Sequence, residues 1–426
     1  MKQRRNIDLT DIASLFLVVY YTWYCLPFMR ATFQGGLYKY LFFGFFAVGA
    51  ALLAVARLQH NGLSIAFQPW RSILVPIIPY MLIMLLLSVL KIGDATKHIR
   101  VSFTFWGTGI IYYLISFDKK LQVRFGKFLL LLFAVTAVTS SIGVVIDSSA
   151  ARAIANASQR EDAVARDYVL MRKNISGVYL FQSLVVLSPA AIMMMRYRRK
   201  PLWGAVVLVA IVVITLKASF AIACFLLILG CGLALISNRR VPVAVICTFG
   251  LLLILLLPMD SILTFLAGVI PNHYISARLG ELAVFWGQRS IQGDFQLRVQ
   301  SYLYSIRTFL QHPLGVGPWY TYVIGAHGIG FHSEILDDLA RYGLTAVVFY
   351  GVFLREYGHL LKVQWAKINF QCVVFPVVTV YVLFLMTNIA FRSADESIFM
   401  LYILPSLPDI WIQNKKSLIK KKGAQR

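Results

Sequence analysis

Long apolar segments recur along the whole of this 426-residue chain, and they constrain its fold more than any other feature. A stretch of about 18 or more apolar residues is long enough to cross a lipid bilayer as a helix. Apolar residues make up 59% of the sequence, and the mean hydropathy is +0.72. We therefore predict an all-α, polytopic integral membrane protein rather than a soluble one.

We identify about twelve of these segments as transmembrane helices. They are expected near Ile12–Met29, Leu37–Ala56, Ser72–Leu90, Ile99–Phe117, Phe125–Ile146, Ile175–Met195, Leu202–Leu216, Ala218–Ile236, Val241–Leu257, Leu344–Leu361, Phe370–Phe391 and Ile398–Trp411. An even number of spans places both chain ends on the same side of the membrane.

The basic residues predict which side that is. The formal net charge of +23 would suggest a nucleic-acid partner in a soluble chain, but many Lys and Arg residues lie in short connections between apolar segments. Roughly 23 of the 41 basic residues fall on the side of the N-terminus, including those of the basic tail 412–426. The positive-inside rule then places both termini in the cytoplasm. We expect a lipid bilayer, and no nucleic acid, as the surroundings.

Two long connections then face outward, and we treat both as ordered parts of a single membrane domain, residues 1–426. In the first, 147–174, charges of both signs are interspersed, which is typical of a helix lying on the membrane. Arg172 and Asn174 lie at its end, at the mouth of the next apolar segment, and are candidate substrate-binding residues.

The second connection, 259–343, is the large outer loop in which we expect the active site. Phe295–His312 has helical apolar spacing and ends at the breaker cluster His312–Pro318. Arg298 and Arg307 are nine residues apart, which places them on opposite faces of that helix. A second helix is expected after Ser333, a good N-cap.

His332 would lie immediately before the N-terminus of this second helix. The positive end of the helix dipole lowers the pKa of an imidazole, and the neutral form is the one that a general base requires. The structural alternative is a surface or capping histidine. A metal site of His327, His332 and Glu334 matches no recognised ligand spacing, so we expect no metal and no other cofactor.

Lys217 lies in a short hairpin, residues 215–219, between two apolar segments on the outer side. Its ammonium group either extends to the lipid headgroups or points into an outer cavity, where it would bind an anionic substrate.

These residues resemble a known family, the bacterial O-antigen ligases and the O-antigen or capsule repeat-unit polymerases. The matching residues are Arg298, followed fifteen positions later by Pro313 and then Gly315-Val316-Gly317, and His332-Ser333-Glu334 with Gly343 eleven positions after the histidine. The hairpin of Lys217, and Arg172 with Asn174, also fit this family.

The resemblance implies a glycosyltransferase whose donor is an oligosaccharide on undecaprenyl pyrophosphate and whose acceptor is another glycan, with no cofactor. It assigns His332 as the base on the acceptor hydroxyl, and Arg298 with Lys217 as clamps on the pyrophosphate. The family hairpin usually carries Arg, so Lys217 offers a point charge instead of a bidentate contact. The implied protein partners are a flippase and a chain-length regulator.

Two further residues of this segment are candidates for substrate binding. Glu334 either orients His332 or caps the helix. Arg341 contacts glycan or pairs with Asp337 or Asp338 along its own helix, and we favour the structural pairing.

We favour a polymerase, whose acceptor is a second lipid-linked repeat unit, over a ligase that transfers polysaccharide to lipid A core. The alternative from another class is a flippase or other transporter of lipid-linked glycans. Ion-coupled transporters commonly bury acidic residues within helices, whereas here Asp and Glu lie almost wholly in connections or near helix ends.

Overall fold

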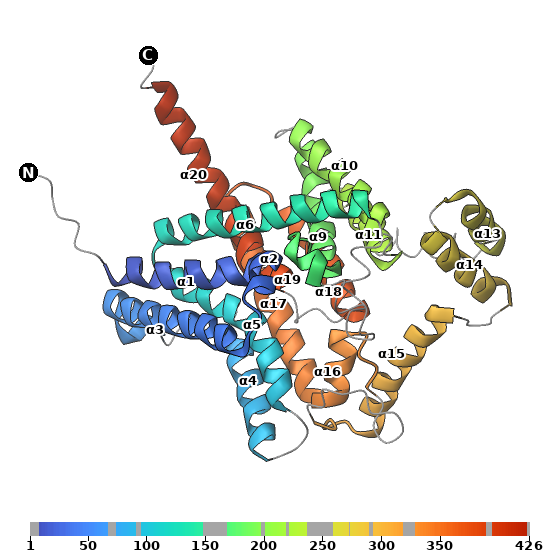
Figure 1. The fold of residues 1–426 in the computed structure, drawn as a ribbon, viewed down its shortest axis with the longest axis horizontal. Coiled ribbons are helices and arrows are strands. Elements are labelled where there is room, and N and C mark those ends of the chain that lie inside the picture. The colour runs from blue at the N-terminus through green and yellow to red at the C-terminus, as the bar shows by residue number, and fades with distance from the viewer. Residues whose placement is uncertain are drawn as a thin grey trace, which may run out of the picture.

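The fold is entirely helical over the residues that the computed structural model describes (Figure 1). These residues are 8–66, 74–90, 95–147, 168–196, 201–218, 221–236, 259–271, 273–288, 293–317, 329–388 and 394–423. No β-strand occurs in these ranges. The predicted all-α class is therefore confirmed for the described part of the chain.

The first half of the chain forms helices that follow the predicted apolar segments, and all but α2 are long. They are α1 (Leu9–Cys25), α2 (Pro27–Thr32), α3 (Gly36–Ala66), α4 (Leu74–Val89), α5 (Ala95–Ile115), α6 (Lys119–Ile146), α9 (Val178–Arg196), α10 (Pro201–Ala218) and α11 (Ala221–Ile236). The predicted surface helix of 147–174 and the predicted span Val241–Leu257 fall mostly or wholly outside the described residues.

The second half begins with four helices from the predicted outer loop. These are α13 (Met259–Val269), α14 (His273–Gln288), α15 (Gly293–Gln311) and α16 (Glu334–Tyr342). The chain continues through α17 (Leu344–Ala366), the short 3₁₀ turn η2 (Gln371–Val373), α18 (Val374–Thr387), α19 (Ala394–Ile398), the π-helical turn η3 (Phe399–Ile403) and α20 (Leu404–Gly423).

Several of the predicted helices differ from the observed ones, most clearly where a helix is broken or ends early. The segment Ile12–Met29 is broken at Leu26, because Pro27 lacks the amide hydrogen that a continuing helix needs and so begins α2 instead. Helix α18 ends at Thr387, four residues earlier than predicted, where Asn388 is extended. The last predicted helix is composed of α19, η3 and α20.

Two helices among the described residues are long and apolar enough to cross a membrane, Gly36–Gln59 within α3 and Lys119–Ile146, which is α6. Seven further apolar helices have 10 to 17 residues. These findings indicate membrane association, and the twelve-span topology stays a prediction.

A buried aromatic cluster fixes the centre of the molecule, where α4, α5 and α17 meet. Trp106 of α5 is fully buried, and its ring lies 5.3 Å from that of Phe349 and 5.9 Å from that of Tyr80. Tyr80 stacks on Phe349 at 4.1 Å. This cluster adjoins α16, whereas α13 and α14 form a hairpin at the periphery of the molecule (Figure 1).

Candidate functional site

The two parts of the sequence that carry the family resemblance come together in the structure. The loop after α15 runs along the C-terminal end of α16, where the amide of Val316 donates to the carbonyl of Ala340 at 3.0 Å and that of Gly317 to the carbonyl of Arg341 at 2.9 Å. The amide of Leu344 donates to the carbonyl of Pro313 at 2.9 Å. These three backbone bonds fix α16 against α15.

Two glycines make this close approach of the backbones feasible. Gly343 has φ +59°, and a Cβ there would lie 2.0 Å from the carbonyl oxygen of Pro313. Gly315 has φ +86°, and a Cβ there would lie 2.3 Å from the carbonyl oxygen of Arg341. Only glycine adopts such φ values without strain and leaves room for the facing backbone.

Ser333 caps α16 as predicted, since its hydroxyl accepts the amide hydrogen of Leu336 at 3.1 Å. Glu334 therefore does not serve as the N-cap residue. Helix α16 is further tied to α15 through Ser305, whose hydroxyl donates to Asp337 at 2.6 Å and accepts the amide of Gly330 at 2.9 Å. Burial raises the pKa of Asp337, while Arg341 and the hydrogen bonds of Ser305 and Ser333 oppose that rise.

His332 lies between these anchors and is half-buried. The residue before it, Phe331, has φ +54° and turns the chain into α16. Burial lowers the pKa of His332, and the positive charge of Arg298 lowers it further. The direction agrees with the prediction, but burial and a facing cation are its causes, rather than the helix dipole on which the prediction relied.

Arg298 is thus the sequence-predicted residue that the structure brings close to His332. It lies on α15 one turn before Tyr302, whose hydroxyl donates to the carbonyl of Thr387 at 2.9 Å. Arg307 is exposed on the same helix, as expected for a residue on the opposite face. A neutral imidazole beside a partly exposed guanidinium can accept a proton while the cation binds an anion.

Arg341 forms the predicted pairing along its own helix. Its guanidinium donates to Asp338 at 2.9 Å, and both side chains are buried, with 2% and 0% exposed. The other carboxylate oxygen of Asp338 accepts the hydroxyls of Tyr80 at 2.6 Å and Tyr350 at 2.9 Å. Asp338 therefore joins α16 to α4 and α17, and the guanidinium also lies 5.1 Å from the ring of Phe331.

Glu334 enters the same buried region from the first turn of α16 and is 3% exposed. Its amide donates to the carbonyl of Asn388 at 3.0 Å. Its carboxylate acts electrostatically on Arg341 and on Glu396, a residue of α19 that is 1% exposed. We call Glu334, Asp337, Asp338, Glu396 and Arg341 the acidic cluster.

Sequence reasoning missed Glu396 because it was assigned to a short connection before the last apolar segment. Connections are usually solvated, so an acidic residue there gives no signal of burial. One signal could have identified it. The acidic pair Asp395-Glu396 lies directly before an apolar segment, and no basic residue follows for more than ten positions.

Asn174 has a structural role. It is buried with φ +58°, its amide nitrogen donates to the hydroxyl of Thr139 at 3.0 Å, and its side-chain oxygen accepts the amide hydrogen of Phe28 at 3.4 Å. Arg172 is exposed and lies 4.8 Å from the ring of Tyr168. Among the described residues, the hydrogen bonds and ring contacts of these two candidates do not reach α15 or α16.

Lys217 belongs to the last turn of α10, but its side chain is outside the described part of the structure. His327 lies outside the described residues altogether. The proposed contact of Lys217 with a pyrophosphate therefore stays a prediction.

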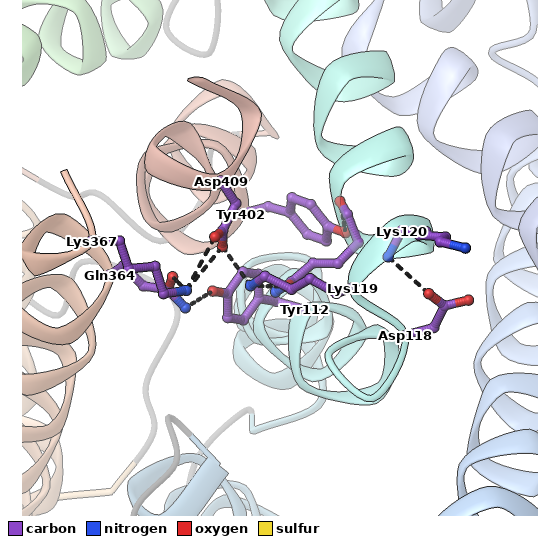
Figure 2. Close-up of polar contacts among 9 residues, drawn as sticks. Tyr112, Asp118, Lys119, Lys120, Gln364, Lys367, Tyr402 and Asp409 are labelled. Carbon is purple, nitrogen blue, oxygen red and sulfur yellow. Dashed lines mark hydrogen bonds and ion pairs between the residues drawn. The ribbon is translucent and has the colours of Figure 1, made fainter. Parts of the chain in front are cut away.

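A second group of polar side chains lies apart from His332 and is shown in Figure 2. Asp409 of α20 pairs with Lys119 of α6 at 2.5 Å and with Lys367, at the end of α17, at 3.1 Å. Each lysine also donates to a glutamine of its own segment, Lys119 to Gln122 and Lys367 to Gln364. We call these five residues the lysine cluster.

Comparisons with known proteins add no identification. No protein-family model matches the chain. The search of curated proteins likewise finds no significant match.

Proposed function

We propose that this chain is a membrane glycosyltransferase that polymerises oligosaccharide repeat units carried on undecaprenyl pyrophosphate, at the outer face of the bacterial plasma membrane. The observation that carries the proposal is the position of His332, a half-buried histidine whose pKa is lowered, within the electrostatic reach of Arg298. Glycosyl transfer with a pyrophosphate leaving group needs a base for the incoming hydroxyl and a fixed cation for the departing charge.

In this mechanism neutral His332 takes the proton of the acceptor hydroxyl as its oxygen forms a bond to the anomeric carbon of the donor. The bond from that carbon to the pyrophosphate oxygen breaks, and the leaving group departs with the electron pair. Arg298 stabilises the negative charge that develops on the pyrophosphate. Lys217 is the proposed second cation.

The proposed topology has about twelve spans with both termini in the cytoplasm. It is supported by the way polar segments group in the fold. The lysine cluster draws on three segments that this topology assigns to the cytoplasmic side, around Lys119, Lys367 and Asp409. The charge of Glu334 acts on Glu396, and the topology assigns both of their segments to the outer side.

The test is the length distribution of surface polysaccharide in cells that lack the gene, complemented with wild type, His332→Ala, Arg298→Ala or Arg307→Ala. We expect long chains with wild type and Arg307→Ala, and single repeat units with the other two. Loss of a general base typically lowers a rate about 10²–10⁴-fold. Normal chains with His332→Ala, at equal levels of inserted protein, would refute the catalytic assignment.

A reaction with purified protein separates the polymerase from the ligase, which is the alternative acceptor choice. Chain lengthening on defined lipid-linked units without lipid A core supports the polymerase. Transfer to core without lengthening supports the ligase.

A second candidate function is transport of lipid-linked glycans. One observation favours it, because Glu334, Asp337 and Glu396 are buried although their segments are connections in the sequence. Buried acidic residues are common in ion-coupled carriers. Intact glycan assembly with His332→Ala, together with its loss in Glu396→Gln, would favour transport over transfer.

A further inference from the structure

The segment that carries His332 is bound on both sides by one pair of buried side chains, Ser305 of α15 and Asp337 of α16. They are 0% and 1% exposed. Two residues before His332, the amide of Gly330 donates to the hydroxyl of Ser305 at 2.9 Å. Directly after His332, the amide of Ser333 donates to Asp337 at 3.4 Å. The hydroxyl of Ser305 donates to the other carboxylate oxygen of Asp337 at 2.6 Å, so the pair joins the two ends of the segment.

The hydrogen atoms available to these groups fix the direction of each bond. The amide of Gly330 can only donate, so the oxygen of Ser305 accepts there and its single hydrogen points to Asp337. Both carboxylate oxygens of Asp337 then act as acceptors, which is the pattern of the ionised form. The three bonds are therefore mutually dependent, and loss of the Ser305 hydroxyl would release Gly330 and leave one oxygen of Asp337 without its donor.

Phe331 shows why this segment needs a restraint. Its φ is +54°, a region that a residue other than glycine occupies at an energetic cost and keeps only where the surrounding structure imposes it. Phe331 lies between the two amides that the pair binds. The segment is also pressed against α15, because a Cβ on Gly330 would lie 2.1 Å from the carbonyl oxygen of Ser301.

Ser305 also relates this segment to Arg298. The two residues are seven positions apart on α15, which at about 100° per residue is only about 20° short of two full turns. They therefore share one face of the helix. The effect of the Arg298 charge on the pKa of His332 agrees with a segment that lies along this face.

We propose that Ser305 and Asp337 are positioning residues, which hold the segment of His332 against the Arg298 face of α15 so that the imidazole and the guanidinium act on one substrate molecule. This inference rests on the proposed function, in which His332 is the base and Arg298 is the cation. Both positioning residues are buried and act through His332 rather than on the substrate.

The first test is Ser305→Ala, which removes the shared hydroxyl. Alanine suits a helix interior better than serine, so α15 is retained. We expect kcat for lengthening of defined lipid-linked units to fall about 10²-fold, the order of loss that follows when a reacting group is misplaced by about 1 Å. The matched control is Ser301→Ala, one turn earlier on α15, where the hydroxyl donates to the carbonyl of Leu297 in its own helix. It should leave kcat unchanged.

A nuclear magnetic resonance titration of labelled histidine separates positioning from a purely structural role, with the His332 signal assigned by its loss in His332→Ala. A purely structural role would lower the amount of folded protein without changing the pKa of His332 in the folded fraction. Positioning predicts that Ser305→Ala raises this pKa toward its ordinary value, because the released imidazole is less buried and farther from Arg298. An unchanged pKa in folded Ser305→Ala would overturn the proposal.

Hydrogen exchange of wild-type protein in detergent needs no variant. The amides of Gly330 and Ser333 should exchange slowly, and exchange of both at the rate of an unstructured peptide would also overturn the proposal. Its failure is distinguishable from that of the proposed function. Full kcat in His332→Ala refutes the proposed function, whereas loss of kcat in His332→Ala with normal kcat in Ser305→Ala refutes the positioning alone.

Discussion

The acidic cluster and the lysine cluster have opposite balances of positive and negative charge and differ in their exposure to solvent. In the lysine cluster one carboxylate, 9% exposed, is shared by two lysines that are 33% and 50% exposed, so cations exceed anions and solvent reaches them (Figure 2). In the acidic cluster four carboxyl groups meet a single guanidinium that is 2% exposed.

The lysine cluster is a structural contact. The acidic cluster is a site in which buried groups of like charge lie together at an electrostatic cost. The lysine cluster connects the start of α6, the end of α17 and the middle of α20 through ion pairs that a partly solvated rim tolerates at little cost. The acidic cluster shifts the pKa values of Asp337 and Glu396, and it adjoins a histidine whose pKa is also shifted. Groups of perturbed residues in one place are typical of functional sites.

The largest effect should come from removing the ionic centre of the acidic cluster. Asp338→Ala leaves Arg341 buried without its carboxylate and deprives two tyrosine hydroxyls of their acceptor. We expect a loss of about 3–5 kcal/mol in the free energy of unfolding, measured by denaturant titration in detergent. Arg307→Ala, at an exposed position of α15, is the control and should change stability by less than about 0.5 kcal/mol. A loss below about 1 kcal/mol for Asp338→Ala would mean that the two clusters do not differ energetically.

The backbone contact that positions α16 should be the next most sensitive feature. Gly343→Ala forces a side chain into a positive φ and against the carbonyl of Pro313, so we expect a loss of at least about 1–3 kcal/mol in thermal or denaturant unfolding. Gly351→Ala in α17 is the matched control, since a Cβ there meets nothing within 4 Å. It should stabilise the protein by about 0.5–1 kcal/mol. Equal effects of the two substitutions would contradict this account of Gly343.

A smaller effect is expected in the lysine cluster. Asp409→Asn removes the shared carboxylate but leaves two lysines that can reach water, so we expect a loss of about 1 kcal/mol or less. The loss should shrink as NaCl is raised, because salt screens exposed ion pairs. A loss as large as that of Asp338→Ala would show that both clusters are energetically central.

The smallest expected effect is a shift in the titration of His332. Arg298→Ala removes a cation that disfavours the imidazolium, so the pKa of His332 should rise toward its ordinary value without reaching it, since burial is the larger cause. Nuclear magnetic resonance of labelled histidine can follow this pKa, and Arg307→Ala should leave it unchanged. A fall in the pKa would contradict the proximity of the two residues.

Much of the helical architecture could be predicted from the sequence, because apolar length and breaker residues act locally. The cap at Ser333, the helix Phe295–His312 and the pairing of Arg341 with Asp338 all rest on spacing within one helix, and the structure confirms them. Pro27 shows the limit of this reasoning, since the apolar segment around it continues while the helix does not.

The candidate site was predicted less completely, because its parts come from distant segments. Spacing identified His332 and Arg298 separately, but only the fold brings their charges together and buries the histidine. Long-range interactions such as the hydrogen bond of Tyr80 to Asp338, residues 258 positions apart, have no local signature. The assignment of Asn174 to substrate was a hypothesis from position alone, and its hydrogen bonds to Thr139 and Phe28 favour a structural role.

The π-helical turn Phe399–Ile403 separates α19, which carries Glu396, from α20, which carries Asp409. A π turn holds one residue more than the α-helical path would, and each residue of an α-helix advances the direction of a side chain by about 100°. The turn therefore rotates the side chains of α19 about the helix axis relative to those of α20. Removing one of its residues would make the helix continuous and rotate the side chains of α19, which carries Glu396, by about 100° relative to those of α20, which carries Asp409. The extra residue thus sets the direction of Glu396 relative to Asp409 on the same stretch of helix.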